Sequence, residues 1–388
     1  MPKGGRIGVR KHLVLVGGGH AHLTVLVNLA SYVQRGHRVT LINPSPYQYY
    51  SGMSPGMLSG IYRPREVRFH VKKMTEDRGG EFIEDKVVKI DPFNRNLFLQ
   101  GGKQLPYDVA SFNTGSEVPL DLLFAVSQEN IIPVKPVENL LRVHRLIFPV
   151  LKSGMHFTVI GGGPAGVEIT ANLWRLVKES QGEAKIILIA GRKLLGSFPE
   201  KVRTLALRSL SQRGIEVLEG TRVKEIRKEL VILSEGRSLP FDFAFLALGI
   251  RPSSIFHESG LPTGEDGGLR VNSHLQSVAY PELFGGGDCI SLSGHPLAKV
   301  GVHAVRQNPL LFRNLVAALE GGEMQTFIPQ EDYLQILNMG DGRGILWKKS
   351  FVWEGRLAFL LKDYIDRRFM RNFQVSGELE EGETASGE

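Results

Sequence analysis

Residues 14–22 read VLVGGGHAH, an apolar run that passes directly into three glycines and then into a helical pattern. A second apolar run, Arg38 to Ile42, follows, so the stretch predicts a strand–helix–strand unit. In such units one glycine makes the tight turn. The next lets the backbone approach a pyrophosphate, which faces the free N–H groups of the helix N-terminus. Gly17 and Gly19 stand in these two places, and the stretch therefore predicts a dinucleotide site.

The same design returns downstream as FTVIGGGPAG, residues 157–166, with a partner strand expected at 186–189. Residues 241–249 also repeat the layout of residues 107–115, with an aspartate in second place and a glycine in last place. An internal repeat of this kind favours two related domains over a chance motif match. The chain therefore predicts an α/β fold with two Rossmann-like (three-layer ββα) domains and two bound dinucleotides.

Both copies depart from the usual pattern. His22 replaces the third glycine of the first copy, and Asn43 stands where an acid usually binds the ribose diol, although its amide can still form a hydrogen bond there. A catalytic role for His20 and His22 competes with a plain helix-start role. In the second copy Arg192 and Lys193 take the place of the acid, which favours the 2′-phosphate of NADP(H); the alternative is two solvated loop charges.

Composition limits the class of protein. The chain has 388 residues, 42% of them hydrophobic, which suffices for two domains. Its single cysteine excludes a disulfide framework, a redox disulfide within the chain and a multi-cysteine metal site, and no metal site is predicted. The net charge of +7 fits an ordinary basic protein, one that meets an anionic membrane surface, or one that binds nucleic acid. The nucleic-acid alternative rests on charge alone, and no nucleic-acid partner is expected. Without a signal-peptide pattern or an apolar run of about 20 residues, a cytoplasmic protein is expected, either free or peripheral on the membrane face.

Three further segments carry predictions. Residues 44–60 are rich in glycine, proline and tyrosine and predict a functional loop that covers a flat ring system. The C-terminal part predicts a hairpin and then, at 356–370, a basic amphipathic helix that suits either docking on the body or a membrane interface. From Ser376 onward the chain is rich in Glu, Gly and Ser, which predicts a disordered tail.

Across nearly its whole length the chain resembles the FAD-dependent pyridine nucleotide-disulfide oxidoreductases, in the branch of type II NAD(P)H dehydrogenases. It is similar above all to the dehydrogenase-like domain that is also found fused to selenophosphate synthetase. The resemblance is carried by the two glycine motifs, by YYSGM at 49–53, by Gly287-Asp288, by GVHAVR at 301–306 and by KDYIDRRFM at 362–370. It implies FAD and NAD(P)H as cofactors.

The resemblance also implies how the chain is divided. FAD lies on the first motif and NAD(P)H on the second. An FAD-binding domain is expected at residues 10–118 and 251–325, interrupted by an NAD(P)-binding domain at 119–250. A membrane- or interface-associated segment is expected at 326–375 and a disordered tail at 376–388.

Residue roles follow from the same resemblance. Asp288 is implied to hold the ribitol, and Val87 to meet the adenine. The full set of implied cofactor contacts is Gly17, Gly19, His20, Ala21, Asn43, Val87, Thr114, Gly115, Gly161, Gly163, Pro164, Ala165, Gly166, Arg192, Gly249, Gly287 and Asp288. Glu168, Pro55 and Lys135 are implied to act beside the reacting rings. The alternatives are structural. Glu168 would be an acid that stabilises the start of a helix, and Lys135 would be an ordinary surface lysine.

The leading hypothesis is a flavoprotein that passes hydride from nicotinamide to flavin and then electrons to a quinone or another small acceptor. Type II dehydrogenases have two glutamines near the quinone, where this chain has Val302 and Arg306, so the acceptor is left open. Cys289 has no partner cysteine, which disfavours sulfide:quinone and disulfide reductases. The alternative hypothesis is a dinucleotide-binding accessory or redox-sensing flavoprotein with little turnover, including one linked to selenium metabolism. A homodimer is a further expectation.

Overall fold

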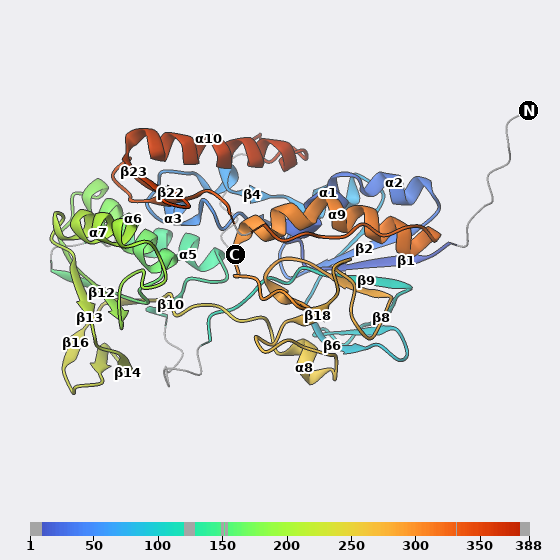
Figure 1. The fold of residues 1–388 in the computed structure, drawn as a ribbon, viewed down its shortest axis with the longest axis horizontal. Helices are drawn as coiled ribbons and strands as arrows, with labels where there is room; N and C mark the ends of the chain where they lie inside the picture. The colour runs from blue at the N-terminus through green and yellow to red at the C-terminus, as the bar shows by residue number, and fades with distance from the viewer. Residues whose placement is uncertain (1–9, 120–128, 149–150, 152–153, 331, 381–388) are drawn as a thin grey trace, which may run out of the picture.

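The computed structural model describes residues 10–119, 129–148, 151, 154–330 and 332–380. Two parallel five-stranded sheets form the centres of its two halves (Figure 1). The first has the order β19 (Leu283–Gly285), β9 (Val109–Phe112), β1 (His12–Val16), β2 (Arg38–Asn43) and β5 (Glu81–Glu84). The second has the order β10 (Ile131–Pro133), β17 (Phe243–Leu246), β11 (Met155–Ile160), β12 (Ala184–Gly191) and β13 (Glu216–Glu219). The predicted α/β fold with two Rossmann-like halves is confirmed.

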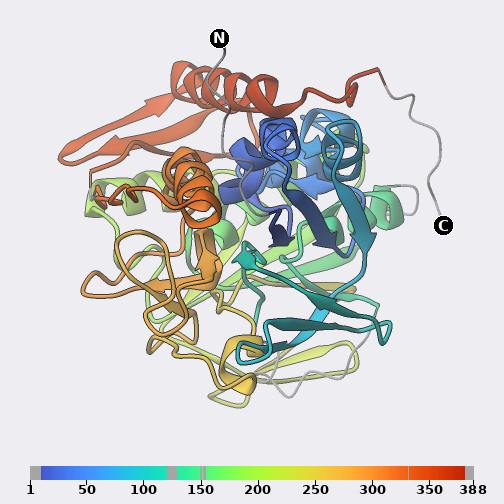
Figure 2. The same ribbon diagram turned by 90° about the vertical axis from the view of Figure 1, so that its right-hand side faces the viewer.

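Each half has three layers. Helices lie on one face of the parallel sheet and a three-stranded antiparallel sheet lies towards the other, as Figures 1 and 2 show. The antiparallel sheets are β6 (Val87–Asp91), β7 (Asn96–Leu99) and β8 (Gln104–Pro106), and β14 (Val223–Arg227), β15 (Leu230–Leu233) and β16 (Ser238–Pro240). Two-stranded pairs are β3 (Gln48–Tyr49) with β4 (Arg68–Phe69), and β18 (Leu269–Val271) with β20 (Ile290–Leu292).

The helices follow the apolar patterns of the sequence. They are α1 (Leu23–Val27), α2 (Leu29–Gln34), α3 (Ser54–Leu58), α4 (Val71–Glu76), α5 (Glu138–Ile147), α6 (Pro164–Glu179), α7 (Glu200–Ser211), α8 (Ile255–Glu258), α9 (Gly301–Glu320) and α10 (Arg356–Phe373). β19 joins the first sheet although it follows the second sheet along the chain. The division into domains at 10–118, 119–250 and 251–325 stays a prediction.

The internal repeat is visible in matched hydrogen bonds. Asp108 accepts one at 2.6 Å from the backbone N–H of His12, at the start of β1. Asp242 accepts the same bond at 2.7 Å from the backbone N–H of His156, near the start of β11. In both halves an aspartate after the antiparallel sheet therefore ties that sheet to the central parallel strand.

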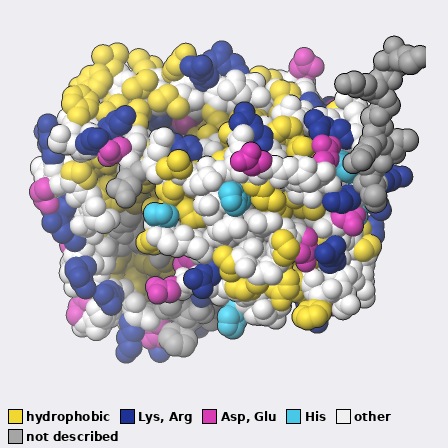
Figure 3. Space-filling view, turned by 45° about the vertical axis from the view of Figure 1, so that its right-hand side comes forward, with side chains coloured by type: hydrophobic (Ala, Val, Ile, Leu, Met, Phe, Trp, Pro, Cys, Tyr) yellow, Lys and Arg dark blue, Asp and Glu magenta, His cyan; other side chains and the backbone are white. Residues whose placement is uncertain are grey.

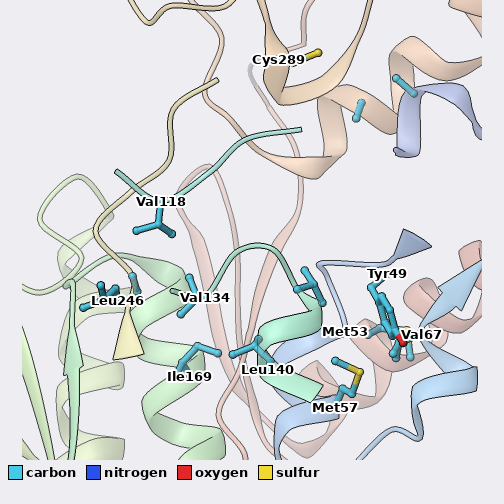
Figure 4. Close-up of a cluster of buried hydrophobic side chains, with 14 of the residues drawn as sticks. Tyr49, Met53, Met57, Val67, Val118, Val134, Leu140, Ile169, Leu246 and Cys289 are labelled. Atoms are coloured by element: carbon cyan, nitrogen blue, oxygen red, sulfur yellow. The ribbon is translucent and has the colours of Figure 1, made fainter. Parts of the chain in front are cut away.

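Residues 44–60 differ from the expected irregular loop. β3 lies in this segment, and α3 follows it with every one of its residues buried. α3 packs against α5 and α6, and Figure 4 shows Met57 in the same buried cluster as Leu140 and Ile169. Only the first part of the segment stays free to line a cavity, because burial of methionine and leucine draws the second part into the core.

The C-terminal segment folds onto the other elements. β21 (Gln335–Asn338), β22 (Gly344–Lys348) and β23 (Phe351–Gly355) form an antiparallel sheet, and α10 follows it. A disordered tail was expected from residue 376 onward. In the structure Ser376 and Glu378 are still buried, so the folded part extends beyond that boundary. Glu378 accepts hydrogen bonds from the backbone N–H groups of His70, at 3.2 Å, and Ser376, at 3.0 Å. Residues 381–388 of the predicted tail lie outside the described residues.

Candidate active site

One cavity of about 1200 Å³ is lined by both glycine motifs. Ordinary ligand pockets hold roughly 300–1000 Å³, so this one is large enough for more than one small ligand. The predicted site residues that line it are Gly17, Gly19, His20, Asn43, Val87, Thr114, Gly115, Lys135, Gly161, Gly163, Pro164, Ala165, Gly249, Gly287 and Asp288. The two halves of the chain therefore open into one common space.

The first glycine of each motif stands where no side chain fits. A Cβ atom on Gly17 would lie 2.4 Å from the carbonyl oxygen of Asn113, and one on Gly161 would lie 2.0 Å from that of Ala247. Both glycines have positive φ angles, +86° and +132°. The backbone turns tightly at the same point in both halves, as a dinucleotide pyrophosphate requires.

The helix N-terminus of the second motif is open to the cavity. Gly163 precedes α6, and among the residues that the structure describes no side chain caps the N–H groups of this helix. A Cβ on Gly163 would meet nothing within 4 Å. The free N–H groups and the positive end of the helix dipole are thus available to an anion in the cavity, so these residues fit a bound dinucleotide.

The third position explains how the first motif tolerates a histidine. In the second motif a Cβ on Gly166 would lie 1.8 Å from the carbonyl oxygen of Gly161. In the first motif His22 donates from Nδ1 to the carbonyl oxygen of Gly17 at 2.7 Å, and Nε2 accepts from the hydroxyl of Ser111 at 2.8 Å. A 3₁₀ turn at His20–His22 precedes α1 in the first motif, whereas α6 begins directly after Gly163 in the second. His22 is fully buried and is a structural residue.

Asn113 joins the two parts of the first site. Its Oδ1 accepts from the N–H of Ala21 at 2.9 Å, and its Nδ2 donates to the carbonyl oxygen of Gly286 at 2.6 Å. The first glycine turn is thereby fastened to the Gly287-Asp288 turn. Our sequence reasoning missed Asn113, although a polar residue directly after the buried strand 109–112 was an available signal.

A charged pair lies where Gly287-Asp288 meets the second half. Lys135 donates to Oδ2 of Asp288 and to the hydroxyl of Ser116, both at 2.9 Å, and Ser116 donates to the same Oδ2 at 2.9 Å. Burial disfavours the charged carboxylate, yet Lys135 and Ser116 hold the pKa of Asp288 below its ordinary value. An ionised carboxylate and a cation therefore face the cavity side by side.

His20 presents a buried nitrogen without a partner. Its Nε2 forms no hydrogen bond with any described residue, and its ring packs edge-on against Tyr50 and Phe369. Burial lowers the pKa of His20 to about 4, with Asp288 opposing the shift. His20 therefore contributes a neutral ring to the cavity wall.

Glu168 lies outside the cavity lining, in a cluster that involves α10. Burial raises the pKa of Glu168 to about 7, although Lys362 opposes the shift, and its Oε1 accepts from the N–H of Asn338 at 2.7 Å. Lys362 pairs with Asp366 at 2.6 Å, and Tyr50 donates to Asp366 at 3.0 Å. The structure thus ties Glu168 to the C-terminal segment rather than exposing it to the cavity.

Other predicted residues also stay off the cavity wall. Pro55 is buried inside α3, Arg192 is exposed outside the wall, and Gly166 packs against Gly161. Asn43 does line the cavity, but its Oδ1 accepts from the N–H of Gly18 at 2.9 Å and its Nδ2 donates to the carbonyl oxygen of Ser45 at 2.6 Å. Its amide is thus bonded both to the first glycine turn and to its own loop, whereas the sequence predicts a hydrogen bond to a ribose. The roles of all these residues stay predictions.

Two tight glycine turns, the second of them at an open helix start, line one cavity, as expected of a protein that binds two dinucleotides. Residues 11–308 match the family model described as pyridine nucleotide-disulphide oxidoreductase. The chain belongs to this family. It is an oxidoreductase with FAD and NAD(P)H as its cofactors, and the superfamily predicted from the sequence is confirmed.

Individual relatives are distant but extend over most of the chain. Ferroptosis suppressor protein 1 of Taeniopygia guttata is 26% identical over 313 residues, covering 77% of this chain and 80% of the relative. An internal alternative NAD(P)H-ubiquinone oxidoreductase A1 of Arabidopsis thaliana is 27% identical, covering 73% and 61%. NDH2 from Plasmodium falciparum, solved with NADH, has the same fold at a TM-score of 0.80 and 14% identity, covering 95% of this chain and 98% of that one.

Proposed function

We propose that this chain is an FAD-dependent NAD(P)H dehydrogenase that delivers electrons to a quinone. The observation that carries the proposal is the single cavity that both glycine motifs line. FAD, when bound, supplies the chemistry of accepting a hydride from NAD(P)H and of passing electrons onward. A shared cavity lets the two ring systems meet without a mobile carrier, so the task of the protein is to position them.

Each half contributes its own part to that positioning. Gly17, Gly19 and the Asn113 bridge would hold the pyrophosphate of FAD, and Asp288 would bind its ribitol through the oxygen that Lys135 leaves free. The open start of α6 at Gly163 would hold the pyrophosphate of NAD(P)H. Lys135 would place positive charge beside the reacting rings and so stabilise negative charge that develops there.

A quinone acceptor is supported by relatives whose names include NAD(P)H-ubiquinone oxidoreductase. The lone Cys289 is buried, and burial raises the pKa of its thiol. A thiol in this state is a poor nucleophile, so the proposal assigns no thiol chemistry to the site. A small organic acceptor is the better match to these residues.

The test of the function is anaerobic reduction followed by reoxidation. The purified holoprotein is expected to show a flavin absorption band that bleaches when NADH or NADPH is added without oxygen. A short-chain ubiquinone analogue is then expected to restore the band. Absence of bleaching would reject the dehydrogenase; bleaching that ferricyanide reverses but the quinone does not would reject the quinone.

We further propose that α10 attaches the protein to an anionic membrane surface, on the cytoplasmic side. No described helix is long and apolar enough to span a membrane. α10 docks on the body through Ala358, Asp366 and Met370, and Figure 3 shows hydrophobic side chains along the upper edge, where Figure 1 places this helix. Its outer face exposes Leu357 (61%), Leu360 (56%), Leu361 (39%), Tyr364 (55%) and Ile365 (43%). One face of α10 thus docks on the body, while the opposite face exposes apolar side chains that suit a membrane interface.

The variant Leu357→Ser/Leu360→Ser/Tyr364→Ser is expected to lower binding to phosphatidylglycerol vesicles by at least about tenfold, since each leucine contributes roughly 1.5–3 kcal/mol when buried. Flotation of the holoprotein with vesicles measures the effect, and the flavin band should be retained. Phe93→Ser removes an even more exposed apolar residue (89%) far from α10 and serves as the control. Equal retention of wild type and triple variant would contradict membrane attachment.

A further inference from the structure

NADPH differs from NADH by a phosphate on the adenosine ribose, and this ribose is expected at the outer end of the second half. In a Rossmann unit the adenosine ribose lies over the end of the second strand, which here is β12, ending at Gly191. The cavity wall beside Gly191 is formed by Phe198, Arg222 and Val223. β13 pairs with β12, and the chain leaves β13 at Glu219 only three residues before Arg222. Arg222 therefore lies on the wall next to the expected ribose.

The internal repeat gives an independent argument for this place. Arg222 accepts a backbone hydrogen bond at 2.8 Å from Ser234, and Lys86 accepts the matching bond at 2.8 Å from Gln100 in the first half. Val223 then corresponds to Val87, the residue expected to meet the adenine of FAD. Arg222 thus precedes the adenine contact of its own half, within reach of the adenosine.

The carboxylates nearby are neutralised. Glu219 accepts from the N–H of Leu194 at 2.6 Å and binds Arg203 through both oxygens, at 2.9 and 2.7 Å. Glu200 pairs with Lys193 at 2.9 Å and with Arg203 at 3.0 Å. The acids around the β12 loop are therefore occupied by cations, and neither carboxylate is left to bind a ribose diol or to repel a phosphate.

Two cations remain at this end. Within the described residues, Arg192 and Arg222 are exposed and form no ion pair. Arginine binds phosphate through two parallel N–H donors, and a 2′-phosphate is the one group that NADPH adds to NADH. Arg222 on the cavity wall and Arg192, which lies outside the wall but follows its residue Gly191 in the chain, are therefore two unpaired cations beside neutralised acids.

We propose that Arg222, together with Arg192, binds the 2′-phosphate of NADPH and makes this chain prefer NADPH to NADH. Arg203 acts as a positioning residue, because its hydrogen bonds to both oxygens of Glu219 neutralise a carboxylate that would repel the phosphate. The proposal rests on the assignment of NAD(P)H to the second glycine motif, but not on the identity of the electron acceptor.

Calorimetric titration of the holoprotein with adenosine 2′,5′-bisphosphate and with 5′-AMP tests the proposal without any electron transfer. Wild type is expected to bind the bisphosphate about tenfold more tightly or better, as charge-assisted hydrogen bonds allow. In Arg222→Ala the ratio of the two Kd values should fall towards one, and Arg222→Lys should be intermediate. High salt should lower the wild-type ratio, since both arginines are exposed.

Two further variants make the outcome decisive. Arg203→Ala, which frees the Glu219 carboxylate, should lower the preference for the bisphosphate without removing a phosphate contact. Arg237→Ala, an exposed arginine paired with Glu216 and off the cavity wall, should leave the ratio as in wild type. If Arg222→Ala weakens both nucleotides equally, the arginine serves the adenine and the proposal is wrong; an unchanged ratio would also overturn it. A protein that binds the bisphosphate selectively but reduces no quinone would contradict only the acceptor.

Discussion

Replacing Gly161 with alanine is expected to lower the free energy of unfolding by more than about 3 kcal/mol, or to prevent folding of the second half. The new Cβ would lie 2.0 Å from the carbonyl oxygen of Ala247, which is backbone and cannot move aside without disturbing β17. The φ angle of +132° adds strain for any residue with a side chain. Urea denaturation followed by circular dichroism measures the loss.

Gly163→Ala is the matched control two residues away. Gly163 has a φ of −81°, and its Cβ would meet nothing within 4 Å, so stability should change by less than about 1 kcal/mol. Binding of NAD(P)H should nevertheless weaken, because the methyl group would stand in the cavity where the backbone approaches the pyrophosphate. Equal stability of the two variants would contradict the backbone clash at Gly161.

The second large effect is a loss of stability at acidic pH that depends on His22. Burial lowers the pKa of His22 from 6.5 to about 4, so the folded state favours the neutral ring more strongly than the unfolded chain does. The stability that this provides is present above pH 6.5 and is lost as the pH falls towards 4. At 1.36 kcal/mol per pH unit, the full loss is about 3 kcal/mol.

His22→Gln should remove the part of the pH-dependent loss of stability that His22 causes. It also destabilises the protein at neutral pH, because it disturbs the hydrogen bonds to Gly17 and Ser111. The measurement is the free energy of unfolding at pH 7 and at pH 4.5 for both proteins. His295→Gln, a change at an exposed histidine, should keep the wild-type pH dependence. If His22→Gln loses as much stability as wild type between the two pH values, His22 is not the titrating group.

Local patterns were sufficient for the central strands β1, β2, β11 and β12 and for both glycine turns. Around Val14 and Val159 an apolar run passes directly into glycines, so these stretches carry their own structural information. The repeat of Asp108 and Asp242 was also readable, and matched hydrogen bonds accompany it. These features depend on neighbours in the chain or on one repeated unit.

The parts that could not be predicted depend on contacts between distant segments. The burial of α3 requires α5 and α6, which begin 80 or more residues later, so residues 44–60 read as a loop when taken alone. Glu168 was expected beside the rings. In the structure it belongs to a cluster with Lys362 of the last helix and does not line the cavity. The contacts of Asn113 and the position of Arg222 on the cavity wall follow only from how the strands around them pair.

The C-terminal segment fastens one half of the molecule to the other. Asn338 binds Glu168 at 2.7 Å in the second half, whereas Lys362 donates to the carbonyl oxygen of Gly52 at 2.6 Å in the first. A hinge rotation of the halves would break these bonds and uncover the side of α10 that docks on the body. We therefore expect a stiff frame in which the two halves keep their relative placement while nucleotide binds and product leaves.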